Sequence, residues 1–573
     1  MTPLVSVTDL SVTFPTGGAA VRAVDGLSFA LAPGGALGIV GESGSGKSTA
    51  AYALLGLHRG TGAQVTGSVQ VAGHDVQAAD EAGLRRIRGG AAAMVFQDPL
   101  SSLDPYQAVG DQIAEVYRAH RPGASRRAAR ERAAEVLDRV GIPDAARRAR
   151  SRPHEFSGGM RQRALIAMAL ACEPRLLVAD EPTTALDVTV QAQVLGLLGE
   201  LRAETGMGLI LVTHDLGVAA GSVDDLLVMK DGRAVEHGPV RDVLETPREP
   251  YTRALLAAVP RVQHSRGGQP PDPRPETRAD AVAPTGAARA TSVNVRRSVE
   301  PVPATDDSVL LEATGLRREF GRGRHAVTAV DDATLTVRAG ETVGVVGESG
   351  SGKTTLGRML VRLLEPTGGE LRYRGRAIGG LKERELRPFR SELQMVFQDP
   401  VSSLNPRRSI GESIADPLRA AGKLDDTSIV ARVRELLERV GLDPDAYHRY
   451  PHEFSGGQRQ RVGIARALAP EPKLIVCDEP VSALDVTTQA QVVRLLGELQ
   501  RDLGLALVFI AHDLAVVRQV SDRLVVMQGG RIVEEGPADA VYEHPRHAYT
   551  RGLLAAVPRL GTEDGTALQG APA

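Results

Sequence analysis

Gly41-Glu-Ser-Gly-Ser-Gly-Lys-Ser-Thr49 is the most informative stretch of this 573-residue sequence. It directly follows the apolar run Leu37–Val40, and Gly-x4-Gly-Lys-Ser/Thr between a strand and a helix is typical of a phosphate-binding loop. Its glycines let backbone N–H groups turn toward an anion, and the next helix N-terminus adds positive potential. A chance Gly-Ser linker ending in lysine is the alternative. It becomes negligible because Gly347-Glu-Ser-Gly-Ser-Gly-Lys-Thr-Thr355 repeats the stretch 306 residues later in the same context.

Four further segments also occur twice and in the same order. Val95-Phe-Gln-Asp-Pro99 returns after 301 residues as Val396-Phe-Gln-Asp-Pro400. The offset is 298 residues for the other three pairs, which are Phe156–Gly159 and Phe454–Gly457, Asp180–Pro182 and Asp478–Pro480, and His214–Asp215 and His512–Asp513. Because the offset drifts only slightly, the chain contains one kind of domain twice, with small changes of loop length.

The segment between the two copies predicts a disordered linker. Residues 262–306 contain seven prolines and no Leu, Ile, Met, Phe or Tyr, so they cannot build a core. As a random coil this segment would span roughly 40 Å, enough for the two copies to dock face to face. We therefore expect domains at 1–261 and 307–558 and a loose tail at 559–573.

Composition and charge narrow the possible functions. The net charge is −2 and the pI is near 6.7, so no long-range field attracts a polyanion, and nucleic acid is not an expected partner. Only two cysteines are present, Cys172 and Cys477, which excludes a disulfide framework, a four-cysteine zinc site and a cysteine-ligated iron–sulfur cluster. A reducing cytoplasm fits best. The start lacks a signal-peptide pattern and the apolar runs are shorter than a membrane span, so any membrane role is expected to be peripheral.

Each copy is predicted to have an α/β fold. Continuous apolar runs precede the phosphate loops, the Asp-Glu pairs and the histidines, as in a parallel sheet covered on both faces. These runs are Leu37–Val40, Val343–Val346, Leu176–Ala179, Leu474–Cys477, Leu209–Val212 and Leu507–Ile510. Between the glutamine and serine motifs the apolar period becomes helical, which predicts an inserted helical subdomain. The apolar positions are Ala129, Ala133, Val136, Leu137 and Val140, and Ile429, Val433, Leu436, Leu437 and Val440.

The repeated motifs supply the groups that ATP hydrolysis requires. Lys47 and Lys353 can neutralise terminal phosphate charge, and each is followed by a hydroxyl, Ser48 or Thr354, that can ligate Mg²⁺. Asp180 and Asp478 end apolar strands, where a carboxylate can hold a Mg²⁺-bound water. The adjacent Glu181 and Glu479 can accept the proton of the attacking water. The alternative for each acidic pair is a solvated loop or a helix cap.

The histidines separate into two groups. His214 and His512 follow apolar strands after the Asp-Glu motif, which favours contact with a γ-phosphate over a histidine bonded at a sheet edge. The others are interpreted as helix- or loop-capping residues and not as metal ligands: His154, His452, His544 and His547. Cys172 and Cys477 are expected to be buried small hydrophobes.

The segments Phe-Ser-Gly-Gly-Met-Arg-Gln-Arg163 and Phe-Ser-Gly-Gly-Gln-Arg-Gln-Arg461 resemble the signature that separates ATP-binding-cassette proteins from other phosphate-loop ATPases. Gln97 and Gln398, Asp187 and Asp485 in Ala-Leu-Asp, and the two histidines extend the similarity over nearly all of both copies. The resemblance implies two such domains in tandem, each with a parallel-sheet core, an antiparallel β subdomain and an inserted helical subdomain. It also implies intramolecular head-to-tail pairing, in which each ATP lies between the phosphate loop of one copy and the signature of the other.

The resemblance assigns the site residues one by one. The ATP-binding residues it implies are Phe14, Gly41, Ser43, Gly44, Gly46, Lys47, Ser48, Thr49, Ser157, Gly158, Gly159, Phe320, Gly347, Ser349, Gly350, Gly352, Lys353, Thr354, Thr355, Ser455, Gly456 and Gly457. Phe14 and Phe320 are the adenine-stacking candidates, and a place in the core is their alternative. The implied Mg²⁺ ligands are Ser48, Gln97, Asp180, Thr354, Gln398 and Asp478, and the catalytic residues are Glu181, Glu479, His214, His512, Gln97 and Gln398.

Two further stretches are similar to dipeptide and oligopeptide importer ATPases. They are the glutamine loops, which end at Pro105 and Pro406, and the domain ends Tyr251-Thr-Arg253 and Tyr549-Thr-Arg551. The fused arrangement is similar to the glutathione-type importers of that group. This resemblance implies two membrane permease subunits, an extracytoplasmic solute-binding protein and a peripheral place at the cytoplasmic face of the membrane. Some relatives hold an iron–sulfur cluster in a cysteine-rich end, but this chain lacks that end, so no cluster is expected.

Two other functions remain as alternatives. One is import of another solute, such as nickel or a sugar. The other is a soluble tandem cassette that acts as an ATP-gated clamp on ribosomes, although such proteins typically have a long charged helical arm where this chain has a proline-broken segment. A DNA-repair cassette with zinc modules is excluded by the cysteine count.

The signatures of the two copies differ at one position, which is Met160 in the first and Gln458 in the second. We expect the site built on Lys353 to lack one amide hydrogen bond and to be modestly unequal to the other, with a solvent-facing, neutral Met160 as the alternative.

Overall fold

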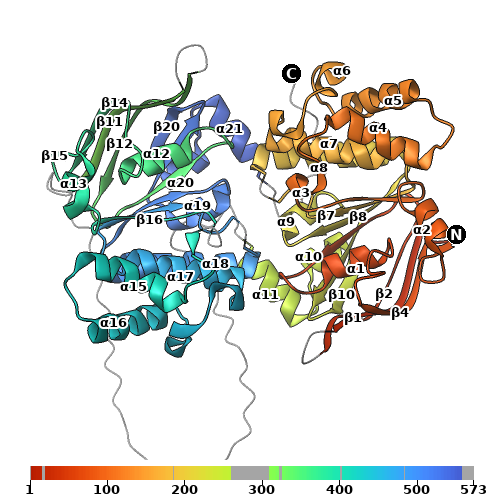
Figure 1. Ribbon diagram of the computed structural model, residues 1–573, viewed down its shortest axis with the longest axis horizontal. Coiled ribbons are helices and arrows are strands. Elements are labelled where there is room, and N and C mark those ends of the chain that lie inside the picture. Colours follow the sequence, from red (N-terminus) through yellow and green to blue (C-terminus); the bar gives the residue numbers. More distant parts are fainter. Residues whose placement is uncertain are drawn as a thin grey trace, which may run out of the picture.

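The structure is a computed structural model of the chain. It describes residues 2–15, 20–184, 186–259, 309–321, 326–399, 403–482 and 484–557. The first copy of the repeat lies on the right of Figure 1 and the second on the left. The predicted linker at 262–306 and the predicted tail at 559–573 lie outside the described residues, as do the predicted domain limits at 261, 307 and 558.

A mainly parallel sheet of six strands forms the centre of each copy. Its strands are β3 (Ala36–Val40), β6 (Ala92–Val95), β7 (Leu176–Asp180), β8 (Gly208–Thr213), β9 (Asp225–Lys230) and β10 (Arg233–Pro239), and then β13 (Thr342–Val346), β16 (Leu393–Val396), β17 (Leu474–Asp478), β18 (Ala506–Ile510), β19 (Arg523–Gln528) and β20 (Arg531–Pro537). The order is β10-β9-β3-β8-β7-β6 in the first copy, and β16-β17-β18-β13-β19-β20, the equivalent order, in the second. Only β10 and β20 run antiparallel to their neighbours. Every apolar run predicted as a strand lies in these sheets.

A second, antiparallel sheet of four strands covers part of each copy. Its strands are β1 (Val5–Pro15), β2 (Ala20–Leu31), β4 (Gln64–Val71) and β5 (His74–Asp75), and β11 (Val309–Phe320), β12 (Val327–Arg338), β14 (Gly368–Tyr373) and β15 (Arg376–Ala377). The orders are β2-β1-β4-β5 and β12-β11-β14-β15. The antiparallel β subdomain implied by the family resemblance is therefore present in both copies.

A helical insert separates β6 from β7, and another separates β16 from β17. The first contains α3 (Pro99–Ser102), α4 (Val109–His120), α5 (Arg126–Arg139), α6 (Ala145–Arg148), the 3₁₀ turn η1 (Pro153–Glu155) and α7 (Gly158–Leu170). The second contains α15 (Ile410–Ala421), α16 (Asp426–Arg439), the 3₁₀ turns η5 (Pro444–His448) and η6 (Pro451–Glu453), and α17 (Gly456–Leu468). The predicted apolar positions of α5 and α16 are buried, but both helices end one residue before Val140 and Val440, which are their C-caps.

The remaining helices surround the two sheets of each copy. They are α1 (Lys47–Ala53), α2 (Glu81–Ile87), α8 (Val188–Thr205), α9 (Leu216–Ala220), α10 (Val240–Glu245) and α11 (Pro250–Ala258), and α12 (Lys353–Leu360), α13 (Glu383–Leu386), the 3₁₀ turn η4 (Arg387–Phe389), α18 (Val486–Leu503), α19 (Leu514–Val520), α20 (Ala538–Glu543) and α21 (Ala548–Ala555). Because successive strand residues point to opposite faces, β3 contributes to two cores. Leu37 and Ile39 pack with the antiparallel sheet and α1, whereas Val40 packs in the core that contains the helical insert.

The two copies share an interface. Val188, at the start of α8 in the first copy, packs within a buried cluster made otherwise of second-copy residues. A second contact between the copies joins α11 of the first copy to α18 of the second (Figure 1). A cavity of about 120 Å³ is lined by segments of both copies, including His214 and His512. The interface therefore brings together the segments that follow β7, β8, β17 and β18.

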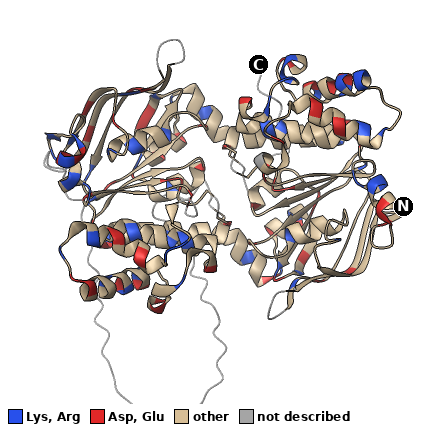
Figure 2. Ribbon diagram, viewed as in Figure 1, with Lys and Arg blue, Asp and Glu red and all other residues tan. Residues whose placement is uncertain are grey.

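The outer surface carries both signs of charge. Acidic and basic side chains are interspersed over the face of both copies in Figure 2. Within the part of the chain that the structure describes, no helix is long and apolar enough to cross a membrane.

Candidate functional site

The phosphate-binding loops depend on glycine backbone conformations. Gly46 has φ 96°, and a Cβ placed there would lie 2.2 Å from the carbonyl oxygen of Ala23, so any side chain is excluded. Gly44 has φ 81° and no atom within 4 Å of an added Cβ, which leaves open space where the loop can receive an anion. Gly350 and Gly352 reproduce these two features in the second copy.

The loop lysines are held by the carbonyl groups of their own loops. Lys47 Nζ donates to the backbone oxygens of Gly41 at 2.8 Å and Glu42 at 2.7 Å. Lys353 does the same with Gly347 at 2.7 Å and Glu348 at 2.8 Å. Both lysines are buried, and burial lowers the pKa of each. The ammonium groups thus lie within the loops, where they can also meet phosphate charge.

A hydroxyl and an aspartate meet beside each phosphate loop. Ser48 Oγ donates to Asp180 Oδ1 at 3.0 Å, and Thr354 Oγ1 donates to Asp478 Oδ1 at 2.8 Å. The second oxygen of Asp180, Oδ2, is buried without a hydrogen-bond partner among the described residues. Burial raises the pKa of Asp180 to about 6 and also raises that of Asp478. A buried carboxylate oxygen without a donor is unfavourable unless a cation compensates it, so this oxygen-rich pair fits Mg²⁺.

The glutamate next to each aspartate has a strained backbone and a fixed carboxylate. Glu181 and Glu479 have φ 46° and 44°, a region that non-glycine residues seldom adopt. Glu181 is held by three side chains: Gln97 Nε2 donates to Oε2 at 2.7 Å, Thr184 Oγ1 donates to Oε2 at 2.9 Å, and His214 Nδ1 lies 3.1 Å from Oε1. These contacts bring the predicted glutamine, glutamate and histidine together in one cluster.

Electrostatics keep the Glu181 carboxylate charged. Burial pushes its pKa upward, but the hydrogen bond and charge of His214, with Thr184 and Lys47, outweigh burial and leave the pKa below its ordinary value. Burial likewise pushes the pKa of His214 downward, and Glu181 and Asp215 reverse this so that the net pKa is raised. An ionised carboxylate at this position can accept a proton.

The second copy has the same cluster with fewer bonds. Gln398 Nε2 donates to Glu479 Oε2 at 2.8 Å, as in the first copy. His512 Nδ1 is 3.7 Å from Glu479 Oε2, beyond hydrogen-bond distance. Ser482, the equivalent of Thr184, donates to the backbone oxygen of Glu479 instead of its carboxylate. The two candidate bases therefore differ in how firmly their side chains are fixed.

The signature serines begin the helices that close each insert. Ser157 Oγ accepts the N–H of Met160 at the start of α7, and Ser455 Oγ accepts that of Gln458 at the start of α17, both at 3.3 Å. Gln458 Oε1 also accepts the N–H of Ser455 at 3.0 Å, which completes a capping box that Met160 cannot form. No hydrogen bond joins either serine to the opposite phosphate loop among the described residues.

The aspartates of the Ala-Leu-Asp segments reach the interface. Asp187 caps α8 and its Oδ2 accepts the backbone N–H of Ser349 in the other copy at 3.4 Å. Asp485 caps α18, but its Oδ2 accepts the hydroxyl of Thr488 at 3.1 Å. The Asp187–Ser349 bond places a helix start of the first copy beside the phosphate loop of the second.

The two candidate adenine-stacking phenylalanines, one of the predicted capping histidines and the two cysteines can also be placed in the structure. Phe14 packs edge-on against His58, with ring centroids 5.6 Å apart, and Phe320 is 41% exposed with the Arg318 guanidinium over its ring. Their role in stacking adenine stays a prediction. His547 caps α21, as expected, and both cysteines are buried, as expected. The positions of the remaining predicted residues follow from their elements: Thr49 and Thr355 lie in α1 and α12, and Gly158, Gly159, Gly456 and Gly457 lie in the first turns of α7 and α17.

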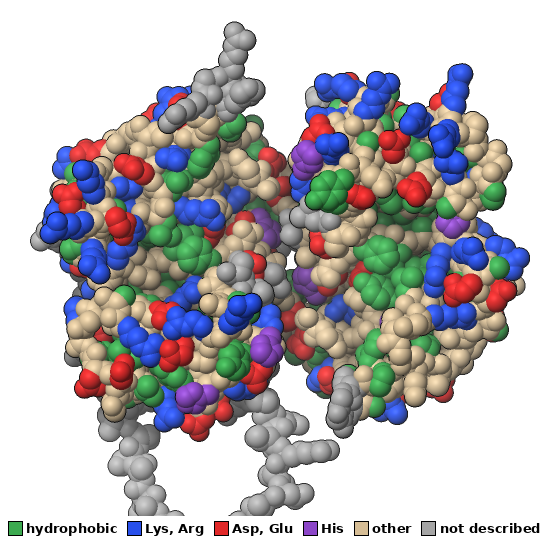
Figure 3. Space-filling model, in the orientation of Figure 1, with side chains coloured by type: hydrophobic (Ala, Val, Ile, Leu, Met, Phe, Trp, Pro, Cys, Tyr) green, Lys and Arg blue, Asp and Glu red, His purple; other side chains and the backbone are tan. Residues whose placement is uncertain are grey.

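The surroundings of the two glutamine loops differ in chemistry. In the first copy a hollow beside Gln97 is lined by apolar side chains such as Phe96, Leu165 and Met168, and also by charged or polar ones such as Arg88, Asp98 and His120. Figure 3 shows hydrophobic side chains gathered between the insert and the core. In the second copy Arg466 takes the place of Met168 and donates to the backbone oxygen of Ser403.

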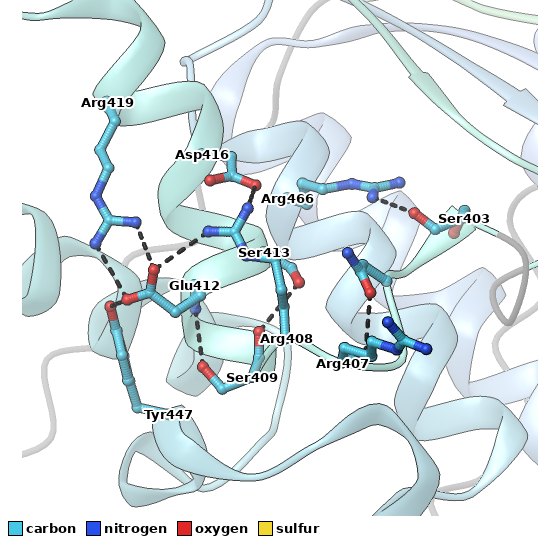
Figure 4. Close-up of polar contacts among 11 residues, drawn as sticks. Ser403, Arg407, Arg408, Ser409, Glu412, Ser413, Asp416, Arg419, Tyr447 and Arg466 are labelled. Carbon is cyan, nitrogen blue, oxygen red and sulfur yellow. Dashed lines mark hydrogen bonds and ion pairs between the residues drawn. The ribbon is translucent and has the colours of Figure 1, made fainter.

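Beside Arg466 lies an ion-pair network (Figure 4). Glu412 accepts from Arg419 at 2.6 Å and from Tyr447 at 3.0 Å, and Arg408 donates to Asp416 at 2.6 Å. The second glutamine loop therefore borders an ion-pair network, whereas the first borders a hollow lined by both apolar and polar side chains.

Several contacts at the site were not predicted from the sequence. Thr184 holds the Glu181 carboxylate, and the hydroxyls of Tyr251 and Tyr549 accept N–H groups of the phosphate loops. In the sequence, the Tyr-Thr-Arg triplets indicate only a similarity to importer ATPases. The signal that could have drawn attention to the tyrosines is their recurrence in both copies at similar distances from the phosphate loops.

In the first copy a phosphate loop follows β3, the Asp-Glu pair begins at the last residue of β7, and the insert ends in a serine-capped helix. The second copy repeats this arrangement at β13, β17 and α17. These features define each copy as a phosphate-loop ATPase of the cassette type. The family model described as "ABC transporter" matches residues 24–184 and 330–482. The chain belongs to the ABC transporter family and is an ATP-binding, ATP-hydrolysing subunit with two cassettes in tandem. A second model, "Oligopeptide/dipeptide transporter, C-terminal region", matches residues 235–282 and 533–573.

Curated relatives are similar over almost the whole chain. The glutathione import ATP-binding protein GsiA of Escherichia coli O157:H7 is 48% identical over 562 residues, which cover 97% of this chain and 89% of the relative. The protein of the same name from Salmonella typhimurium is 47% identical over 568 residues, with the same shares covered. A solved dimeric ATP-binding cassette with ADP and phosphate is 30% identical, with 40% of this chain and 99% of that chain covered and a TM-score of 0.38.

Proposed function

We propose that the chain energises the uptake of small peptides, with glutathione as the first candidate cargo. The observation that carries this proposal is that an oligopeptide/dipeptide C-terminal region follows both cassettes, in a chain 48% identical to a glutathione import ATP-binding protein. Two membrane permease subunits and an extracytoplasmic solute-binding protein would complete the importer. The chain would bind the permeases peripherally, at the cytoplasmic face of the membrane.

Each ATP would bind at a site built from both copies, within domains that we place at 1–261 and 307–558. One site combines Lys47, Ser48, Asp180, Glu181 and His214 with Ser455 and Gly457. The other combines Lys353, Thr354, Asp478, Glu479 and His512 with Ser157 and Gly159. The Asp187–Ser349 contact supports this pairing because it joins the first copy to the phosphate loop of the second.

Mg²⁺ would be held by the hydroxyl–aspartate pairs, with Gln97 and Gln398 as further ligands. The buried, unpartnered Oδ2 of Asp180 supports this assignment. When bound, the ion supplies positive charge that offsets the charge of the phosphates. Glu181 would accept the proton of the attacking water. Gln97, Thr184 and His214 fix its carboxylate. The pKa of that carboxylate is lowered by His214, Thr184 and Lys47, which keeps it ionised.

The permeases would contact the chain around the glutamine loops. Each loop joins the catalytic core to a helical insert, so a partner there can sense changes around Gln97 and Gln398. The hollow of mixed lining beside the first loop and the ion-pair network beside the second support contact with two permeases that differ in sequence. Substitutions at 98–105 or 399–406 should reduce transport more than basal ATP hydrolysis, and equal loss of both would argue for a purely catalytic loop.

Reconstitution tests the proposal. The chain would be combined with candidate permeases and binding proteins in vesicles, and ATP hydrolysis and uptake would be measured with glutathione, di- and oligopeptides, nickel and sugars. Peptide-stimulated hydrolysis together with uptake of the same peptide supports the proposal. Stimulation by nickel or a sugar alone would assign another cargo, and stimulation by ribosomes without permeases would favour a soluble clamp.

A further inference from the structure

The Tyr-Thr-Arg triplets of the C-terminal extensions occupy equivalent places in the two copies. Tyr251, in the first turn of α11, accepts the backbone N–H of Glu42 on its hydroxyl oxygen at 3.3 Å. Tyr549, in the first turn of α21, accepts that of Glu348 at 2.9 Å. Glu42 and Glu348 are the second residues of the two phosphate loops. A side chain from outside the catalytic core therefore contacts the phosphate loop in each copy.

The rest of each triplet fixes the helix that carries the tyrosine. Thr252 and Thr550 are completely buried. Arg253 and Arg551 turn back to bond the loop that precedes each helix, and their acceptors are the backbone oxygens of Pro247, Arg248, Pro545 and Arg546, at 2.8–3.2 Å. The carboxylates of Glu236 and Glu534 accept backbone N–H groups of the same loops. The tyrosine rings are thus carried by anchored segments and not by free helix ends.

Both backbone groups of the contacted loop residue are occupied. Glu42 donates its N–H to Tyr251 and accepts from Lys47 on its carbonyl oxygen. Glu348 has the same two bonds, from its N–H to Tyr549 and from Lys353 to its oxygen. The peptide group that donates to the tyrosine also holds the loop lysine, because its carbonyl oxygen, from Gly41 or Gly347, accepts from Lys47 or Lys353.

The tyrosines also lie close to the other copy. Burial raises the pKa of Tyr251 and Tyr549 to about 12, so both phenols stay neutral at physiological pH. The charges of Asp485 and Asp187, each from the opposite copy, add to that rise. The helix that carries Tyr251 packs against α18, which Asp485 caps. Movement of one copy against the other can therefore reach the phosphate loop through this helix.

We propose that Tyr251 and Tyr549 are positioning residues that hold the two phosphate loops in the conformation that binds ATP, so that the transporter-type C-terminal extension sets ATP affinity. They act through the N–H groups of Glu42 and Glu348 and do not themselves contact nucleotide. This inference rests on the ATP sites proposed above. Removing either hydroxyl leaves a loop N–H without its partner and should weaken ATP binding about two- to tenfold at that site.

The test uses the full chain with Glu181→Gln and Glu479→Gln, which keeps bound ATP intact, and measures Mg²⁺-ATP binding by calorimetry. Tyr251→Phe should weaken one of the two sites and Tyr549→Phe the other, with the larger effect for Tyr549→Phe because its hydrogen bond is shorter. In chains with only Glu479→Gln or only Glu181→Gln, the corresponding variants should raise the KM for ATP while kcat changes less than twofold.

Tyr542→Phe is the matched control. Tyr542 lies in α20 of the same extension, and its hydroxyl donates to the backbone oxygen of Leu514, away from the phosphate loop. Unchanged ATP affinity in both loop-facing variants, or an equal loss of affinity in Tyr542→Phe, overturns the inference. Lys47→Ala and Lys353→Ala test the sites separately: if they bind ATP normally the proposed sites are wrong, and if they lose binding while the tyrosine variants keep it, only the present inference fails.

Discussion

The backbone N–H of Ser349 in the second phosphate loop donates to Asp187 Oδ2 in the first copy at 3.4 Å. No equivalent bond joins Ser43 to Asp485 among the described residues. The difference has a local cause in the sequence. Thr488 donates its hydroxyl to Asp485 Oδ2, whereas Val190, at the equivalent position of the first copy, has no hydroxyl to offer Asp187. Because Val190 has a methyl group where Thr488 has a hydroxyl, Asp187 Oδ2 remains able to bond across the interface.

Val190→Thr should weaken the cross-interface bond, because its hydroxyl would compete for Asp187 Oδ2. The KM for ATP at the site built on Lys353, measured with the other site silenced by Glu181→Gln, should rise about two- to fivefold, the effect of losing one long, weak hydrogen bond. Val190→Ile, which adds no hydroxyl, is the control. Equal KM values for Val190→Thr and Val190→Ile would show that the bond does not affect nucleotide binding.

Replacing both candidate bases tests the assignment of the catalytic glutamates. Glu181→Gln together with Glu479→Gln keeps an amide of nearly the same shape but removes the proton acceptor. ATP binding should persist while hydrolysis falls by roughly 10²–10⁴, the usual contribution of a general base. Hydrolysis under saturating ATP, with ATP binding measured on the same samples, tests whether these glutamates are the catalytic bases. Near-normal turnover would refute the assigned base.

Asp180→Asn separates a metal ligand from a structural residue. Because burial raises the pKa of Asp180 to about 6 in the folded chain, the ionised side chain lowers stability as pH rises through that value. The asparagine variant, freed of metal by a chelator, should therefore be more stable at pH 7 than the parent, by about 1–3 kcal/mol. The Mg²⁺ concentration needed for half-maximal hydrolysis should rise at least tenfold. Lower stability with an unchanged Mg²⁺ requirement would contradict the assignment.

The ion-pair network of the second insert predicts acid sensitivity. The hydrogen bond and charge of Arg419, with Tyr447 and Arg408, lower the pKa of Glu412 from its ordinary 4.5 to about 2. A lowered carboxyl pKa stabilises the fold above pH 4.5, and that contribution is lost as pH falls toward 2. Since the side chain is partly exposed, Glu412→Gln should lower the free energy of unfolding by only about 1 kcal/mol at pH 7 and by less at pH 3.

Asp111→Asn provides the comparison for that variant. Asp111 occupies the equivalent place in the first insert, and its one ion pair among the described residues is with Arg130, at 3.3 Å between two exposed side chains. Its replacement should cost less than about 0.5 kcal/mol. Thermal unfolding of both variants between pH 3 and pH 7 measures the difference. Equal losses, or a Glu412→Gln loss that grows toward acid pH, would contradict the role assigned to the network.

The sequence predicted the sheet strands, the helical inserts and the clusters of Lys47, Asp180, Glu181 and His214 because these depend on local periodicity and on motifs that occur twice. It did not predict contacts that depend on how distant segments fold back. Tyr251 reaches the phosphate loop from a helix that follows the catalytic core, and no pattern around it indicates that destination. The sequence also did not predict that Asp187 and Asp485 have different hydrogen-bond partners. That difference depends on a single side chain in the first turn of each helix.

At Met160 the structure changes the reason for the expected asymmetry between the two ATP sites. Gln458 uses its amide oxygen to accept the N–H of Ser455, so that oxygen is engaged within its own helix cap. Met160→Gln should complete the same capping box at Ser157 and raise the free energy of unfolding by about 0.5–1.5 kcal/mol. ATP affinity at the site built on Lys353 should change by no more than a few-fold, because the Ser157 hydroxyl is bonded in either case.

Single Glu181→Gln and Glu479→Gln chains, each with and without Met160→Gln, report the two sites separately. Gln458→Met should have the reverse effect on stability in the second copy. If Met160→Gln alters neither unfolding nor nucleotide affinity and turnover in either background, Met160 is neutral and the two signatures are equivalent.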